Sequence, residues 1–282
     1  MKLSHPGAEV FVPDGTAIPQ ALERTTHLAI SAHQDDLEIM AFHGALQGIG
    51  SAANWFTGVT VTNGGGSPRD GLYADYTDEQ MQDVRRLEQK KAAAIGEYSA
   101  AVLLNHPSSA VKDPANADVP ADLRAIVQAT RPRVIYTHNL ADKHDTHIAV
   151  TLRLIAVLRE LPPGAQPEAL YGCEVWRDLD WMIDEDKVAL DVGSHENLAA
   201  SLLGVFDSQI CGGKRYDLAT LGRRRAHATY HATHGTDETT GLTFAMDLLP
   251  LLKDPKLTPA AHVRAHVDRF AAEVAARLRK LQ

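Results

Sequence analysis

The stretch Thr26–Glu38, THLAISAHQDDLE, joins a short apolar run to a cluster of ionisable residues. Residues 26–31 are typical of a buried strand, because the run is short, apolar and bounded by polar residues. The ionisable residues follow at the carboxyl end of this strand and enter a helix that we expect over residues 39–50. In open α/β sheets ligands bind at this edge, so the stretch predicts both a fold class and the place of a site.

Strands and helices alternate from residue 26 to residue 161. We expect strands over residues 26–31, 55–62, 102–104 and 133–136. We expect helices over residues 39–50, 78–96, 120–130 and 147–161. This alternation predicts an α/β fold with a mostly parallel sheet and helices on both faces.

The remainder of the chain is less regular and predicts additional C-terminal helices. We expect strands over residues 171–175 and 188–192, and helices over residues 194–206, 214–230 and about 258–281. The last helix has apolar residues at spacings of three and four, which form one stripe. We interpret the stripe as packing on the chain's own core, with a contact in a homo-oligomer as the alternative. One domain over residues 1–282 is the simplest organisation.

Composition and charge exclude some classes of protein. The chain has 282 residues and a formal net charge of −8, which argues against a general nucleic-acid binder. It has no apolar stretch of the length that a membrane span needs, and residues 1–19 lack the pattern of a signal peptide. With only two cysteines, a cytoplasmic protein with free thiols is expected.

His33, Asp35 and Asp36 form the first candidate constellation. His33 and Asp36 are three residues apart, so both side chains can point to one side of a turn. Imidazole nitrogen and carboxylate oxygen are ordinary zinc ligands, and Asp35 would then remain free to act as a general base. The alternative is a helix N-terminus that favours acidic residues, which explains one Asp but not His33.

A second constellation follows the strand expected at residues 133–136, and it contains His138, Asp142, His144, Asp145 and His147. It should open at the same edge of the sheet as the first. One of His144 and His147 could complete a metal site while the other stays free. A catalytic zinc usually has three protein ligands and an open position for water. The alternative is a solvated loop that happens to be rich in histidine.

These residues carry a resemblance to a known family. The chain resembles the LmbE-like, PIG-L type N-deacetylases in Ala32-His33-Gln34-Asp35-Asp36, in His144-Asp145-Thr146-His147 and in the Arg85-x-x-Glu88 helix. Gln34 stands where the family usually has Pro, and Asp145-Thr146 where it usually has Pro-Asp.

The resemblance implies a Rossmann-like three-layer sandwich and a set of roles. His33, Asp36 and His147 would bind Zn²⁺, although another divalent metal such as Fe²⁺ is possible. Asp35 would be the general base, and His144 would stabilise the oxyanion or act as an acid. Arg85 would approach the substrate. Asp142 also looks familial, and it could supply a carboxylate behind the ligands.

The implied function is zinc-dependent hydrolysis of an N-acyl group, chiefly N-acetyl, on an amino sugar or a related polar small molecule. One rival is a non-haem iron enzyme with the same two-His-one-carboxylate site. The other is an inactive sugar-binding homologue.

Other residues have weaker signals. The Gly-rich loop that begins at Asn63 could let a substrate approach the backbone closely, and we expect Asn63 to contact it. His227, His231 and His234 are spaced by four and three near the end of a helix. A second metal site there is conceivable, but histidines are also favoured at helix C-termini. Ser208 and Cys211 fit no nucleophile motif, and we assign them no covalent role.

Overall fold

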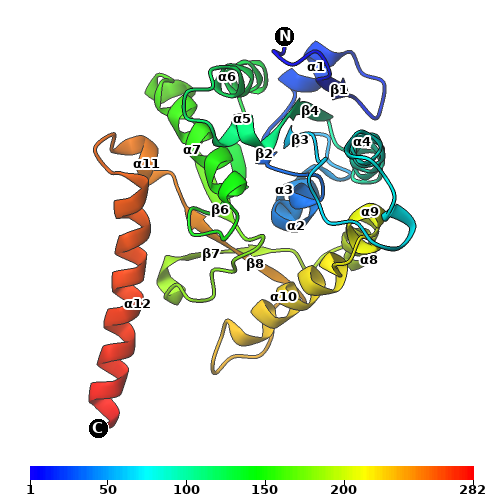
Figure 1. Cartoon of the computed structure of the whole chain (residues 1–282). Coiled ribbons are helices and arrows are strands. Elements are labelled where there is room, and N and C mark those ends of the chain that lie inside the picture. Colours follow the sequence, from blue (N-terminus) through cyan, green and yellow to red (C-terminus); the bar gives the residue numbers. More distant parts are fainter.

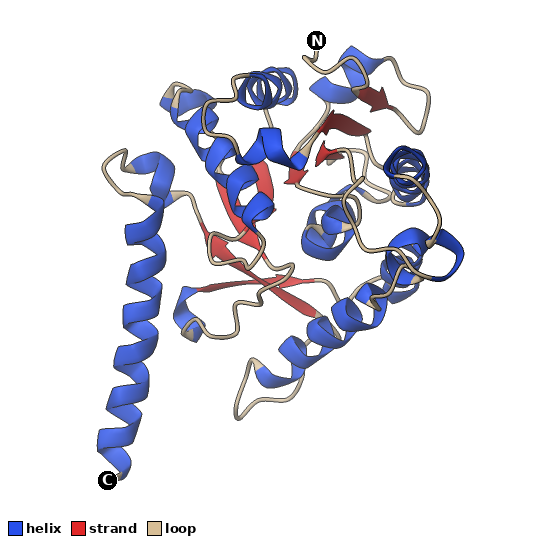
Figure 2. Ribbon diagram, viewed as in Figure 1, coloured by secondary structure: helices blue, strands red, loops and turns tan.

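The computed structural model describes residues 1–282, and an eight-stranded mixed sheet lies at its centre. Helices cover both faces of this sheet (Figures 1 and 2). The strand order is β1-β4-β3-β2-β5-β6-β8-β7. The strands are β1 (Glu9–Phe11), β2 (His27–Ser31), β3 (Phe56–Thr62), β4 (Ala100–His106), β5 (Val134–His138), β6 (Ala169–Cys173), β7 (Lys187–Asp191) and β8 (Leu242–Asp247).

Strands β4, β3, β2, β5 and β6 are parallel neighbours, so the predicted α/β fold with a mostly parallel sheet is confirmed. Every residue of β2 is buried. Leu28 and Ile30 belong to one hydrophobic cluster and Ala29 to another, because successive side chains of a strand point to opposite faces. The helices on both faces therefore each cover a separate apolar layer.

The order in which the chain adds strands to the sheet reverses between β2 and β5. From β2 it continues through β3 to β4 on one side, and then returns to β5 and β6 on the other. His27 pairs with Val134 and Ala29 with Tyr136, so β2 and β5 run side by side in the same direction. Their carboxyl ends meet at this switch point, where open α/β sheets bind ligands.

The longer expected helices are present, with shifts at several ends. The helices are α1 (Ile18–Glu23), α2 (Asp36–Met40), α3 (Phe42–Gly48), α4 (Asp78–Ile95), α5 (Ser108–Lys112), α6 (Asp118–Thr130), α7 (Asp145–Arg159), α8 (Glu196–Gly204), α9 (Asp207–Ile210), α10 (Tyr216–Tyr230), α11 (Pro250–Lys253) and α12 (Pro259–Leu281). The single helix expected over residues 39–50 is wrong. The chain enters a helix already at Asp36 and breaks it at Ala41, whose φ of −117° and ψ of 20° are not helical.

The far edge of the sheet is antiparallel, because β8 pairs in this sense with both β6 and β7. We did not expect β8. Its sequence LTFAMD does contain β-branched and aromatic residues, but it directly follows a polar stretch that is typical of a loop. Strand β8 matters for the site because it fixes the position of β6 and of the loop that follows it.

Helix α12 projects from the body of the molecule (Figure 1). Only His262 and His266 of this helix are buried, and both lie in its first turns. Phe270 is 40% exposed and Leu278 is 56% exposed, so the interpretation that the whole stripe packs on the chain's own core is wrong. A contact in a homo-oligomer stays a prediction. No helix of the structure has the length and apolar character that crossing a membrane requires.

Candidate metal centre

Three side-chain atoms from two distant stretches of chain converge at the switch point. His33 Nδ1 lies 3.1 Å from His147 Nε2. Asp36 Oδ2 lies 3.3 Å from each of these two nitrogens. The three atoms therefore form a nearly equilateral triangle, which brings together the first and the second sequence constellations.

The size of this triangle fits a zinc ion. An ion bound tetrahedrally at about 2.0–2.1 Å holds its ligand atoms roughly 3.3 Å apart. Asp36 and His147 are buried, whereas the His33 side chain is 22% exposed and lines a cavity. The triangle thus offers three ligands on the protein side and an open side toward solvent, which is the arrangement of a catalytic zinc site.

The local backbone explains how His33 and Asp36 meet. Asp35 has a φ of 81°, so the chain turns through the left-handed region directly before α2. This turn places Asp36 at the first position of α2, where its Oδ2 accepts a hydrogen bond of 2.7 Å from the His33 backbone N–H. Asp tolerates the left-handed region better than most residues. Gln34, in place of the family's Pro, donates from its side-chain amide to the Thr62 carbonyl and anchors the same turn.

Asp142 lies behind the triangle and orients His147. Its Oδ2 is 3.3 Å from His147 Nδ1, so that nitrogen donates to the carboxylate and Nε2 keeps its lone pair for a cation. The same Oδ2 accepts a hydrogen bond of 3.3 Å from the backbone N–H of Trp176. Asp142 therefore also fixes the start of the loop that follows β6.

Two further histidines, His138 and His144, stack on the His147 ring beside the triangle. His138 stacks on His147 with ring centroids 3.8 Å apart, but its Nε2 accepts a 2.8 Å hydrogen bond from the Ala32 backbone N–H. His138 is therefore engaged and not free to bind a cation through that atom. His144 also stacks on His147, with ring centroids 4.6 Å apart, and it lines the cavity.

Electrostatics separate the roles of the two neighbouring carboxyl groups. Burial raises the pKa of Asp36, but the imidazoles of His147 and His138 outweigh burial and hold this pKa below its usual value. Burial and the charges of Asp36 and Glu38 raise the pKa of Asp35 well above its usual value. Asp36 thus favours the ionised form that a candidate ligand needs, whereas Asp35 binds a proton more readily than an ordinary carboxylate.

Nearly half of the chain is similar to a known protein family. Residues 28–158 match the family model described as PIG-L, GlcNAc-PI de-N-acetylase. We refer to residues 28–158 as the PIG-L segment. All the residues of the triangle, together with Asp142 and His144, lie within this PIG-L segment. No curated protein sequence matches the chain.

Solved structures share the fold at low sequence identity. The 4-carboxy-2-hydroxymuconate hydratase GalB from Pseudomonas putida has a TM-score of 0.61 and 17% identity, with 83% of this chain and 98% of that chain covered. N,N'-diacetylchitobiose deacetylase from Pyrococcus horikoshii has a TM-score of 0.56 and 15% identity, with 78% and 83% covered. The zinc-inhibited form of teicoplanin deacetylase has a TM-score of 0.54 and 18% identity, with 79% and 98% covered.

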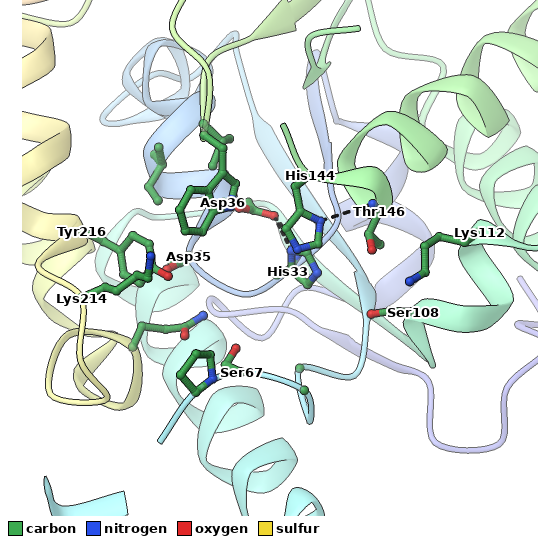
Figure 3. A pocket seen from close by; sticks show the side chains of 17 residues that line it. His33, Asp35, Asp36, Ser67, Ser108, Lys112, His144, Thr146, Lys214 and Tyr216 are labelled. Carbon is green, nitrogen blue, oxygen red and sulfur yellow. Dashed lines mark hydrogen bonds and ion pairs between the residues drawn. The ribbon is translucent and has the colours of Figure 1, made fainter. Parts of the chain in front are cut away.

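The cavity in front of the triangle has a volume of 480 Å³ and extends beyond the PIG-L segment. His33, Asp35 and His144 line it from that segment (Figure 3). Trp176, Gln209, Lys214 and Tyr216 line it from the C-terminal part of the chain. The PIG-L segment thus supplies the candidate ligands, while later elements supply much of the wall.

Arg85 and Asn63 do not line this cavity. Arg85 is 1% exposed and donates to the Gly64 carbonyl and to the side chain of Gln209. The Asn63 side chain accepts a hydrogen bond from the Gly65 backbone N–H. Both residues shape the Gly-rich loop that borders the cavity, and direct contact with a substrate stays a prediction for each.

Glu88, like Arg85, connects α4 to residues of α9, which lies outside the PIG-L segment. Its carboxylate accepts hydrogen bonds of 2.8 Å from the Ser208 backbone N–H and 2.6 Å from the Ser208 hydroxyl. Arg85 contacts the next residue, Gln209, at 3.2 Å. This pair therefore holds α9 against α4 and places Gln209 in the cavity wall.

Trp176, Lys112, Lys214 and Tyr216 line the cavity, and the sequence did not single them out. Lys112 lies in a short helix and Trp176 in a loop, while Lys214 and Tyr216 lie at the start of an expected helix with no motif that marks them as cavity residues. His227 Nε2 donates a hydrogen bond of 3.0 Å to the buried Glu174 carboxylate, whereas His234 is exposed. The structure does not bring His227, His231 and His234 together as a metal cluster.

Proposed function

We propose that this protein is a metal-dependent hydrolase that removes an N-acyl group, in the first place N-acetyl, from an amino sugar or a related polar small molecule. Zn²⁺ is the proposed cation, bound by His33, Asp36 and His147. The observation that carries this proposal is the triangle of ligand atoms with one open side and a free carboxyl group, Asp35, beside it.

When bound, the cation supplies a Lewis acid that polarises an amide carbonyl and lowers the pKa of water. Asp35 lines the cavity, and its carboxyl group takes part in no hydrogen bond with another side chain of the protein. Its carboxylate takes a proton from the attacking water and returns it to the leaving nitrogen. The raised pKa of Asp35 suits this role, because a general base works best with a pKa near the working pH.

His144 acts as a neutral hydrogen-bond donor in this proposal. Burial and the nearby His147 and His33 lower the pKa of His144 to about 4. Its Nδ1 accepts a 3.3 Å hydrogen bond from the Thr146 backbone N–H, so the neutral ring carries its proton on Nε2. That N–H stabilises the carbonyl oxygen as it gains negative charge, without the protonated imidazole that an acid role would need.

The fold alone does not separate this reaction from others, because a hydratase and two deacetylases share it. The PIG-L match of the ligand-bearing segment favours the deacetylase. The iron rival predicts consumption of oxygen with an oxo-acid, and the inactive homologue predicts binding of N-acetyl sugars without release of amine.

The test is amine release from a panel of N-acetylated sugars, measured with the zinc-loaded protein and with Asp35→Asn. We expect wild-type turnover on at least one substrate and a fall in kcat on the order of 10²- to 10⁴-fold in the variant, at unchanged metal content. Asp83→Asn is a matched control, because Asp83 is an exposed carboxylate on α4. Full turnover in Asp35→Asn would refute the assigned base. Absence of amine release from every substrate would refute the proposed function.

A further inference from the structure

A second cavity opens from the first on the side away from the PIG-L segment. It has a volume of 330 Å³. Five residues line both cavities: Ile39, Val175, Trp176, Lys214 and Tyr216. A molecule whose N-acyl group lies at the metal centre can therefore extend into the second cavity without leaving the protein surface.

The second cavity combines an aromatic wall with positive charge. The rings of Trp176 and Tyr216 meet edge to face with centroids 6.0 Å apart. Lys214 Nζ lies 4.5 Å from the centre of the Trp176 ring. Arg215 and Arg223 also line this cavity, and no acidic residue does.

This positive charge is unusual for the molecule as a whole, whose formal net charge is −8. In both cavities the only acidic lining residues are Asp35 and Asp36, which belong to the metal centre. Arg215 is paired with Asp217 at 2.7 Å, whereas Lys214 forms no ion pair and lies over the Trp176 ring. Lys214 is therefore free to pair with an anion, and the guanidinium of Arg223 lies along the same wall.

The wall is rigidly connected to the metal centre. Asp142 accepts a hydrogen bond from the backbone N–H of Trp176 and also orients His147. Arg223 donates a 2.6 Å hydrogen bond to the Val175 carbonyl, which fixes the preceding residue of the same loop. The distance between the metal centre and the aromatic, basic wall is thus set by direct hydrogen bonds, as a specificity site requires.

We propose that the second cavity binds an anionic substituent of the substrate. The substituent carries a carboxylate or phosphate that pairs with Lys214 and Arg223, and its ring or apolar part packs on Trp176. The substrate class is then an N-acylated amino sugar joined to an anionic group. This inference rests on the proposed function for the position of the N-acyl group, but its test can fail separately.

Matched glycosides separate charge from stacking. The methyl, phenyl and 4-carboxyphenyl N-acetylglucosaminides add first an aromatic ring and then a negative charge. N-acetylglucosamine 1-phosphate tests a phosphate group without the aromatic ring. Binding is measured by calorimetry to zinc-loaded Asp35→Asn protein, in which turnover does not interfere. We expect the 4-carboxyphenyl compound to bind about tenfold more tightly than the phenyl compound, as a charged hydrogen bond allows. This ratio should shrink as salt is added.

Two variants test which basic side chains pair with the anion: Lys214→Gln and Arg223→Gln, each in the Asp35→Asn background. We expect each change to reduce the ratio between the two aryl glycosides several-fold, whereas Lys91→Gln, an exposed lysine on α4, should leave it unchanged. Lys112→Gln tests the opposite wall (Figure 3). Equal binding of the charged and neutral aryl glycosides would overturn the proposal, and so would loss of the ratio in Lys112→Gln alone. Either result would leave amine release, and therefore the proposed function, unaffected.

Discussion

Residues 27–159 and residues 169–281 build one cavity, but they contribute different parts of it. The first region contains parallel strands β2 to β5. The loop after β2 and the first turns of α2 and α7 carry the triangle of His33, Asp36 and His147. The second region contains the antiparallel edge of the sheet, and its irregular segments carry Trp176, Lys214 and Tyr216. The PIG-L match ends at residue 158, close to the boundary between them. We therefore propose that the first region carries out the chemistry and that the second selects the substrate.

The largest effect should come from removing a ligand in the first region. His147→Ala takes away one corner of the triangle and leaves the buried Asp36 without one of its neighbouring imidazoles. Loss of a residue that only orients a ligand through a hydrogen bond costs about 10- to 100-fold in metal affinity. Loss of the ligand itself should therefore cost more. Metal analysis of the purified variant should show little bound zinc, and amine release should be undetectable.

His234→Ala is the control for this change, because His234 is an exposed histidine of the second region. It should keep the metal content of the wild type. A His147→Ala protein with full metal content would show that the cation is bound elsewhere, and the division between the two regions would then be wrong.

A smaller effect is expected for Asp142→Asn, which weakens the orientation of His147 and the link to Trp176. The expected loss of zinc affinity is about 10- to 100-fold, measured by competition with a chelator of known affinity. Asp145→Asn is the matched neighbour, since Asp145 is exposed and its side chain does not contact His147. Equal affinities of the two variants would contradict the role of Asp142.

The sequence predicted the first region well for physical reasons. His33 and His144 follow strands that end at the same edge of a parallel sheet, so their proximity follows from topology. The spacing of His33 and Asp36 placed both in one turn, as the structure shows. The left-handed φ of Asp35 and the break at Ala41 were not predicted, because neither residue carries a local signal such as Gly or Pro.

The second region was harder to predict because its positions depend on long-range pairing. Strand β8 joins β6 from more than 60 residues along the chain, and only this pairing fixes the loop with Trp176. Lys214 precedes α10 and Tyr216 is its first residue, and the helix expected over residues 214–230 does not by itself indicate that they face the cavity. Helix α12 shows the opposite case, since its strong periodic stripe predicted a helix correctly but a packed core wrongly.

The smallest effect on stability should come from the exposed end of α12. Leu278→Glu replaces a side chain that is 56% exposed, so the free energy of unfolding should change by no more than about 0.5 kcal/mol. Val263→Glu, at the base of the same helix and against the core, should cost about 1–3 kcal/mol. Chemical denaturation compares the two variants.

Sedimentation of wild type and Leu278→Glu over a range of concentrations tests the predicted homo-oligomer. Loss of self-association in the variant would support a subunit contact through the stripe. A Leu278→Glu protein as unstable as Val263→Glu at low concentration would instead show that the stripe packs within one chain.

The most direct test of the account is a crystal structure of the zinc-loaded protein with anomalous diffraction measured on both sides of the zinc absorption edge. We predict one strong anomalous peak about 2.0–2.1 Å from His33 Nδ1, Asp36 Oδ2 and His147 Nε2, with its open side toward Asp35 and His144. A peak at other residues, or no peak at this triangle in crystals that contain zinc, would contradict the account.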